Sequence, residues 1–145
     1  MYQHILIATD GSALAAKAVA AGLTLAKGLR SRVTVVTVSE PWTALMTPEQ
    51  ALGLPVGEYQ KAAAETASRV LAQVTELAGK SDVACATVHA KDQYPAEGIL
   101  DTAKKAGCDL IVMASHGRGG LAAVVLGSQT VKVLTHSKIP VLVCR

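Results

Sequence analysis

The sequence predicts an α/β fold, with a five-stranded parallel open sheet and helices on both faces. Strand-like and helix-like hydrophobic periods alternate from one end of the 145-residue chain to the other. The strand-like segments are short and almost wholly apolar, which is typical of parallel strands buried on both faces. Phe is absent, and the apolar residues are mainly Ala, Val and Leu, which fit between a sheet and closely packed helices.

The first part of the chain predicts a β-α-β unit followed by an irregular stretch. A strand is expected over 4–9 and a β-branched strand over 33–38, with a helix between them from Ser12 to about residue 29. Ser12 is a favourable N-cap. Residues 40–57 contain Pro and Gly at several positions, so no long regular element is expected there. Loops of this length are often lids or partner contacts.

The rest of the chain continues the alternation. The expected elements are a helix over 58–78 that Gly79 ends, a weaker strand over 82–90, a helix from Pro95 up to Gly107, a strand over 110–114, a helix over 128–136 and a strand over 139–143. No repeat or linker interrupts them. Right-handed crossovers then place helices on both faces of one sheet, and residues 1–145 are expected to form a single domain.

Composition and charge exclude several function classes. The net charge of +3 is small and the basic residues are scattered, so a nucleic-acid partner is not expected. No apolar run reaches the roughly 18 residues of a membrane span, and the first residues lack a signal-peptide pattern, so we expect a cytoplasmic protein. The cysteines Cys85, Cys108 and Cys144 are far apart, which favours buried thiols over a disulfide or zinc site.

Two segments at strand carboxyl ends are candidates for a ligand site, because ligands of open α/β sheets bind at that edge. They are residues 8–12 and residues 114–130. In the second segment, Gly127-Ser128 begins a helix, whose first N–H groups attract anions. Glycines allow close backbone approach, the Ser128 and Thr130 hydroxyls are possible donors, and Arg118 is a possible positive charge. The alternative is that the glycines serve turns and Ser128 caps a helix.

The spacing distinguishes this segment from the two common phosphate loops. Neither Gly-x-x-x-x-Gly-Lys-Ser/Thr nor Gly-x-Gly-x-x-Gly follows the first strand, where Thr9-Asp10-Gly11-Ser12 stands instead. Walker-type NTPases and Rossmann dehydrogenases are therefore disfavoured.

The chain resembles the universal stress proteins, relatives of the adenine-nucleotide α-hydrolase-like, Rossmann-like proteins. The resemblance covers the opening residues 5–12, the variable segment after the second strand and the closing residues 140–143. Its most specific part is the family's ATP signature, Gly-x-x-Gly, nine residues, then Gly-Ser/Thr. Here Ala114-Ser115-His116-Gly117, residues 118–126 and Gly127-Ser128 match the spacing, with Ala114 in place of the first glycine.

The resemblance implies an ATP site, with magnesium on the nucleotide. Asp10 would accept hydrogen bonds from the ribose or the adenine edge, and it also suits the start of a helix. Ala8, Val38 and Met113 would line the adenine pocket, Val38 through its backbone, although Val38 and Met113 are equally explained as core. The remaining implied positions, near the ribose and phosphates, are Ala114, His116, Gly117, Arg118, Gly127, Ser128, Gln129 and Thr130.

Three functions remain open from the sequence. The first is a nucleotide-responsive regulator of a stress response, with turnover absent or slow. The second is a nucleotide-free homodimeric module, paired through the last strand, with Val141 and Val143 at the interface and Leu142 facing inward. The third is a hydrolase using Asp10, His116 and Ser128, which is disfavoured because Ser128 does not lie in a Gly-x-Ser-x-Gly elbow.

Overall fold

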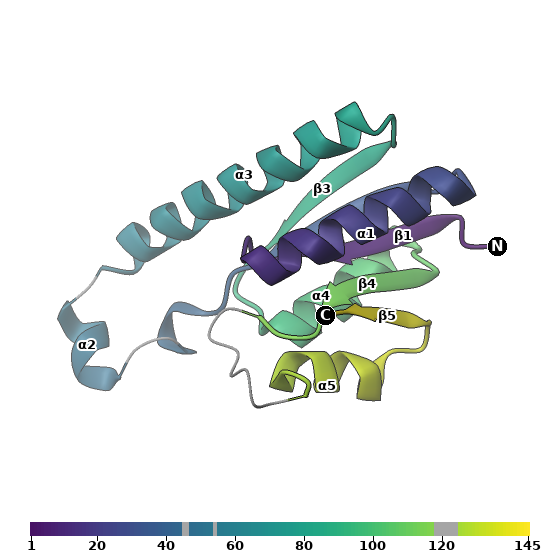
Figure 1. The fold of residues 1–145 in the computed structure, drawn as a ribbon. Coiled ribbons are helices and arrows are strands. Elements are labelled where there is room, and N and C mark those ends of the chain that lie inside the picture. Colours follow the sequence, from purple (N-terminus) through teal and green to yellow (C-terminus); the bar gives the residue numbers. More distant parts are fainter. Residues whose placement is uncertain (45–46, 54, 118–124) are drawn as a thin grey trace.

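Five parallel strands form one open sheet in the computed structural model, which describes residues 1–44, 47–53, 55–117 and 125–145 (Figure 1). The strand order is β3-β2-β1-β4-β5, and all four neighbouring pairs are parallel. The strands are β1 (His4–Ala8), β2 (Arg32–Val38), β3 (Cys85–Ala90), β4 (Leu110–Ala114) and β5 (Val141–Cys144). The predicted sheet is therefore confirmed.

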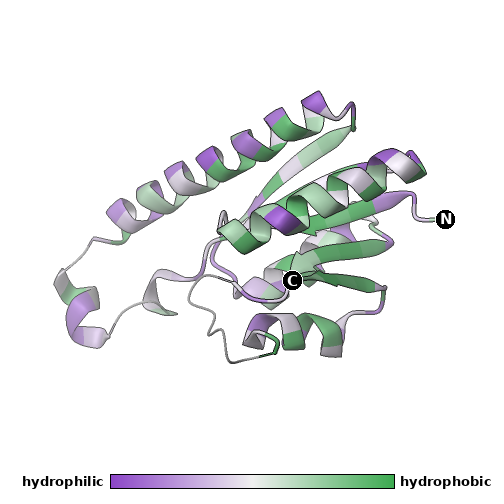
Figure 2. Cartoon of the chain, in the orientation of Figure 1, coloured by the Kyte–Doolittle hydropathy of each residue, from purple (hydrophilic) through white to green (hydrophobic). Residues whose placement is uncertain are grey.

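Helices cover both faces of this sheet. They are α1 (Ala13–Leu29), α3 (Val56–Lys80), α4 (Pro95–Ala106) and α5 (Ser128–His136), whereas the short α2 (Pro48–Gly53) lies away from the sheet (Figure 1). On one face Ile5, Ile7 and Val112 pack with apolar residues of α1 and α3, and on the other Leu6 and Ile111 pack with those of α4 and α5. Figure 2 shows the strands as largely hydrophobic, with the hydrophilic residues on the outer sides of the helices. This two-sided burial explains the apolar runs.

The strand order places a topological switch point between β1 and β4. The chain leaves β1 through α1 on one face of the sheet and leaves β4 toward α5 on the other face. Because β1 and β4 are neighbours, these two connections diverge, and in open α/β sheets such a divergence marks the ligand-binding crevice at the carboxyl ends of the strands. Residues that follow β1 and β4 are thereby brought together.

Local hydrogen bonds explain where several elements begin and end. The Ser12 side chain caps α1 by accepting from the Ala15 N–H at 3.2 Å, as predicted. β5 begins two residues later than expected, at Val141, because Ile139 N–H donates to Ser137 Oγ at 3.2 Å and Pro140 has no N–H for a ladder. The 40–57 stretch holds no long element, but it contains a 3₁₀ turn at Trp42–Ala44 and the short α2.

The orientation expected for β5 is wrong. Val141 packs into the core against α4 and α5, whereas Leu142 is 41% exposed. Neighbouring strand residues point to opposite faces, so only one of the two can fill that core. Among the described strands β5 pairs only with β4, which leaves its other edge open.

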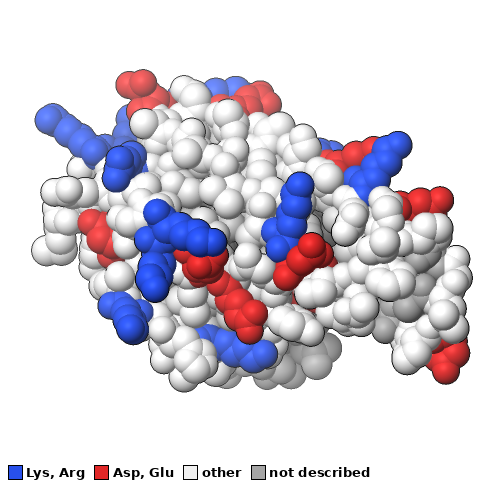
Figure 3. Space-filling model, turned by 180° about the vertical axis from the view of Figure 1, so that it is seen from behind, with Lys and Arg blue, Asp and Glu red and all other residues white. Residues whose placement is uncertain are grey.

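Charged side chains are dispersed over the surface. Figure 3 shows basic and acidic groups interspersed on the face seen from behind, without a large area of one sign. Within the described ranges, no helix combines the length and the apolar character that crossing a bilayer requires.

Candidate functional site

Two loops meet at the switch point, one after β1 and one after β4. Asp10 lies in the first loop and Gly117 in the second. A Cβ added to Gly117 would lie 3.2 Å from Asp10 Oδ2, so the Asp10 carboxylate lies close beside Gly117 of the second loop. The structure thus brings together the two segments that the sequence singled out.

The loop after β1 holds the Asp10 carboxylate in a defined position. The Ser12 N–H donates to Asp10 Oδ1 at 2.9 Å, and the Gly11 N–H donates to Thr9 Oγ1 at 3.2 Å. Gly11 has a φ of 80°, a left-handed conformation that favours glycine. With Oδ1 directed to the start of α1, Oδ2 faces the loop that follows β4.

The N-terminus of α5 is fastened directly to the end of β4. The Gly127 N–H donates to the Ser115 carbonyl at 2.7 Å. The Thr130 hydroxyl donates to the carbonyls of Ala114 and Ser115, at 3.1 Å each. A Cβ at Gly127 would lie 3.2 Å from Ser115 O and 3.3 Å from His116 Cα. Glycine is therefore favoured here by the close approach of backbone atoms, and its φ of −68° is not left-handed.

The first turn of α5 has no side-chain cap. Its N-cap is Gly127, and Ser128 at the first helical position is exposed. The leading N–H groups of a helix have no acceptor within the helix, and the helix dipole favours negative charge beside them. This turn faces the same edge of the sheet as Asp10, and its backbone donors suit an anionic ligand.

Two of the predicted side chains have structural partners instead of facing a ligand. Gln129 Oε1 accepts from the Ala96 N–H at 3.1 Å and so caps the start of α4. The Thr130 hydroxyl, expected from the sequence as a possible phosphate donor, is buried and donates to two backbone carbonyls. The backbone N–H groups of these two residues remain as candidate ligand contacts.

Ala114 occupies the position of the missing glycine without backbone strain. It is the last residue of β4 and pairs with Cys144. Among the described non-glycine residues, a positive φ occurs at Arg30, Asp82 and Asp92. Ala114 therefore does not have a left-handed backbone conformation. Glycine's conformational freedom is not needed at this position.

The predicted adenine-lining residues lie mainly in the core. Ala8 and Met113 are buried in the cluster against α4 and α5. Val38 lies against α4, where a Cβ on Gly98 would approach Val38 Cγ2 to 2.8 Å, so Val38 offers a ligand only its backbone. His116 Nδ1 is hydrogen-bonded to Ser115 Oγ at 3.0 Å. Arg118 lies outside the described residues.

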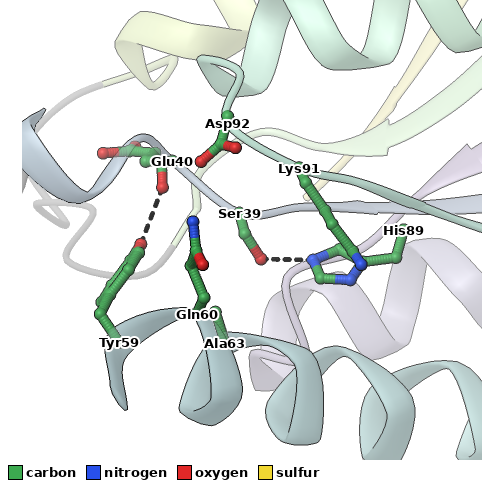
Figure 4. A pocket seen from close by; sticks show the side chains of 8 residues that line it. All are labelled: Ser39, Glu40, Tyr59, Gln60, Ala63, His89, Lys91 and Asp92. Carbon is green, nitrogen blue, oxygen red and sulfur yellow. Dashed lines mark hydrogen bonds between the residues drawn. The ribbon is translucent and has the colours of Figure 1, made fainter. Parts of the chain in front are cut away.

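Sequence reasoning missed a second hollow, a polar pocket of about 200 Å³ at the ends of β2 and β3. Its lining comes from Ser39 and Glu40, from Tyr59, Gln60 and Ala63 on α3, and from His89, Lys91 and Asp92 (Figure 4). The detectable signal was polar residues directly after two strands, the same signal that marks Asp10. Because its parts come from three segments, the first and last of which lie 50 positions apart, no compact motif reveals it.

The charges around this pocket influence two of its side chains. Burial, together with the positive charge of Lys91, lowers the pKa of His89 below its ordinary value. Burial and the negative charges of Glu40 and Asp92 raise the pKa of Tyr59. His89 is therefore neutral at pH 7, and Tyr59 keeps its proton.

Comparison with known proteins gives a consistent result over the full chain. The model of the universal stress protein family matches residues 1–145. The universal stress protein YxiE of Bacillus subtilis (strain 168) is 32% identical over 151 residues, and a universal stress protein of Thermus aquaticus is 35% identical over 146, with 100% of each chain covered. The solved structure of UspA from Lactobacillus plantarum has a TM-score of 0.85 at 27% identity, covering 99% of this chain and 98% of that one.

More distant structures share the fold alone. A universal stress protein in complex with cAMP has a TM-score of 0.71 at 19% identity, covering 99% of this chain and 97% of that one. A universal stress protein from Archaeoglobus fulgidus in complex with dAMP has a TM-score of 0.68 at 17% identity, covering 99% of this chain and 98% of that one. Since the family model and relatives above 30% identity span the whole chain, this protein belongs to the universal stress protein family.

Proposed function

We propose that the protein binds ATP in the crevice between β1 and β4 and acts as a nucleotide-responsive regulator in a stress response. The observation that carries this proposal is the uncapped first turn of α5, held against β4 by the Gly127–Ser115 hydrogen bond. Its N–H groups would hold the phosphates. Asp10, directed at the opposite loop, would accept hydrogen bonds from the ribose or the base.

The other parts of the proposal follow from this assignment. Magnesium would arrive on the ATP phosphates, as it usually does in nucleotide sites. The backbone of Val38 and the buried Met113 would bound the adenine, and an ATP-responsive protein would draw on the cytoplasmic ATP pool. Two proteins of the same fold in complex with cAMP and dAMP are compatible with an adenine nucleotide, although their likeness to this chain extends only to the fold.

Regulation would operate through differential binding. ATP can shift the protein between conformers only by binding one of them more tightly, and no turnover is required for that. We therefore propose a binding protein with hydrolysis absent or slow.

The test is to ask whether the purified protein carries and responds to nucleotide. Acid extraction followed by chromatography is expected to release adenine nucleotide. ATP at a hundredfold excess over its Kd should stabilise the fold by about 2.7 kcal/mol, which raises Tm by roughly 10 °C. GTP at the same concentration serves as the control and should give a smaller shift. An empty extract together with an unchanged Tm in millimolar ATP would contradict the proposal.

We also propose a homodimer that pairs through β5, a role that does not need nucleotide. It is supported by the open edge of β5 within the described sheet and by the exposed Leu142. Such an edge readily pairs with another strand. Light scattering should give twice the 14.9 kDa chain mass, and Leu142→Lys should shift the protein toward monomer. A monomeric wild-type protein at micromolar concentration would exclude this contact.

A further inference from the structure

The polar pocket at the ends of β2 and β3 is separate from the nucleotide crevice. In the strand order β3-β2-β1-β4-β5, the crevice lies between β1 and β4, whereas the pocket lies beside β2 and β3. The pocket is on the α3 face, because Ser39 and His89 meet Tyr59 and Gln60 of that helix there (Figure 4). The side chain of Val38, in contrast, lies on the α4 face. The pocket therefore lies farther along the same edge of the sheet than the switch point, and it begins at Ser39, directly after Val38.

The length of α3 creates this pocket. Its 25 residues span about 37 Å, whereas the six residues of β3 span about 20 Å. The C-terminal turns of α3 pack on the sheet through Leu71, Val74 and Ala78, so the N-terminal turns extend past the strand ends (Figure 1). These N-terminal turns cover the residues that follow β2 and β3.

The pocket offers both hydrogen-bond donors and acceptors in a defined arrangement. A hydrogen bond of 2.6 Å joins Ser39 Oγ and His89 Nε2. The Tyr59 hydroxyl donates to the Glu40 carbonyl at 2.8 Å, which holds the aromatic ring against the pocket. In Figure 4 the Gln60 amide extends from α3 toward the Asp92 carboxylate. An amide, a hydroxyl and a neutral imidazole can each donate and accept.

The charge of the lining disfavours an anionic ligand. Glu40 and Asp92 are two carboxylates, and Lys91 is the one cation among the eight lining residues, so the lining carries a net negative charge. A hydroxyl-rich neutral molecule would use the carboxylate and amide groups as they stand, and its C–H face would suit the flat apolar body of Tyr59. The volume of about 200 Å³ fits a molecule smaller than a typical drug.

We propose that this pocket binds a neutral polyhydroxylated molecule of monosaccharide size. Asp92 and Gln60 bind its hydroxyl groups. Ser39 and His89 line the base of the pocket, and the Tyr59 ring packs against the apolar face of the molecule. This site does not depend on nucleotide binding in the crevice.

The test is a titration of the isotope-labelled, nucleotide-free protein with D-glucose and, separately, with myo-inositol, followed by amide chemical shifts. Saturable shifts are expected at residues 39–40, 59–63 and 89–92. Asp92→Asn should weaken the apparent affinity about tenfold, since it removes a charged acceptor but suits the positive φ of 54° at that position. Gln60→Ala should also weaken binding, whereas Gln73→Ala, at an exposed position farther along α3, should not.

Three outcomes would overturn the proposal. One is the absence of saturable shifts for both compounds up to about 100 mM, beyond which binding is negligible. Another is tighter binding of inorganic phosphate than of either polyol at these same amides. The third is an unchanged affinity in both Asp92→Asn and Gln60→Ala. None of these results bears on ATP binding, which is measured separately.

Discussion

Gly127→Val is expected to weaken ATP binding at least a hundredfold. Even a single methyl group at this position would lie 3.2 Å from the Ser115 carbonyl and 3.3 Å from His116 Cα, and both are backbone atoms. Valine adds two further carbons, so α5 must move away from β4 and the Gly127–Ser115 hydrogen bond is lost. A hundredfold loss corresponds to about 2.8 kcal/mol, the size expected when several backbone donors no longer converge on one anion.

The measurement is isothermal titration with ATP, together with circular dichroism to verify that the variant is folded. Gly127→Ala should give an intermediate affinity, because it adds only the first carbon. Gly79→Val is the matched control, since a Cβ at this exposed position of α3 meets nothing within 4 Å. A folded Gly127→Val protein with wild-type affinity would show that the start of α5 does not hold the nucleotide.

Gly22→Val is expected to lower the free energy of unfolding by about 3 kcal/mol. Gly22 lies where α1 crosses β1, and a Cβ there would lie 2.6 Å from Ile7 Cδ1 and 2.9 Å from Ile7 Cγ1. Ile7 is fully buried, and Val112 Cγ1 on the neighbouring strand lies 3.5 Å from the same added Cβ. The displaced Ile7 side chain therefore has little free space. Interiors packed this closely relax only in part, and the helix must move outward.

Gly28→Val on the same helix is the control. A Cβ there meets nothing within 4 Å, and valine has a slightly better helix propensity than glycine. Its free energy of unfolding should stay within about 0.5 kcal/mol of the wild-type value. Urea unfolding of both variants measures the difference. Equal stabilities would mean that α1 is not held against β1 at Gly22.

Much of the fold could be predicted because it depends on local patterns. The apolar runs identified the strands, and Ser12 marked the start of α1. The sequence could not show which residues of β5 face the core, because Val141, Leu142 and Val143 are all apolar and show no alternation. Its starting residue depended on the hydrogen bonds around Ser137.

The candidate site was only partly predictable for a related reason. Because ligands of open α/β sheets bind at the carboxyl ends of the strands, the sequence was enough to place Asp10 and Gly117 at the same edge of the sheet. The partners of Gln129 and Thr130 lie 33 and 16 positions away in the sequence, so their side-chain roles required the three-dimensional structure. The polar pocket could not be predicted from the sequence, because its lining comes from three distant segments.

The bonds of Gln129 and Thr130 have a further consequence for recognition. Together they tie the beginning of α5 to both α4 and β4 through groups of the protein itself. An anion arriving at this turn would find the amide groups already oriented, so the entropic cost of arranging them was met when the chain folded. Such preorganisation would let a few neutral backbone groups compete with water for a strongly hydrated ligand.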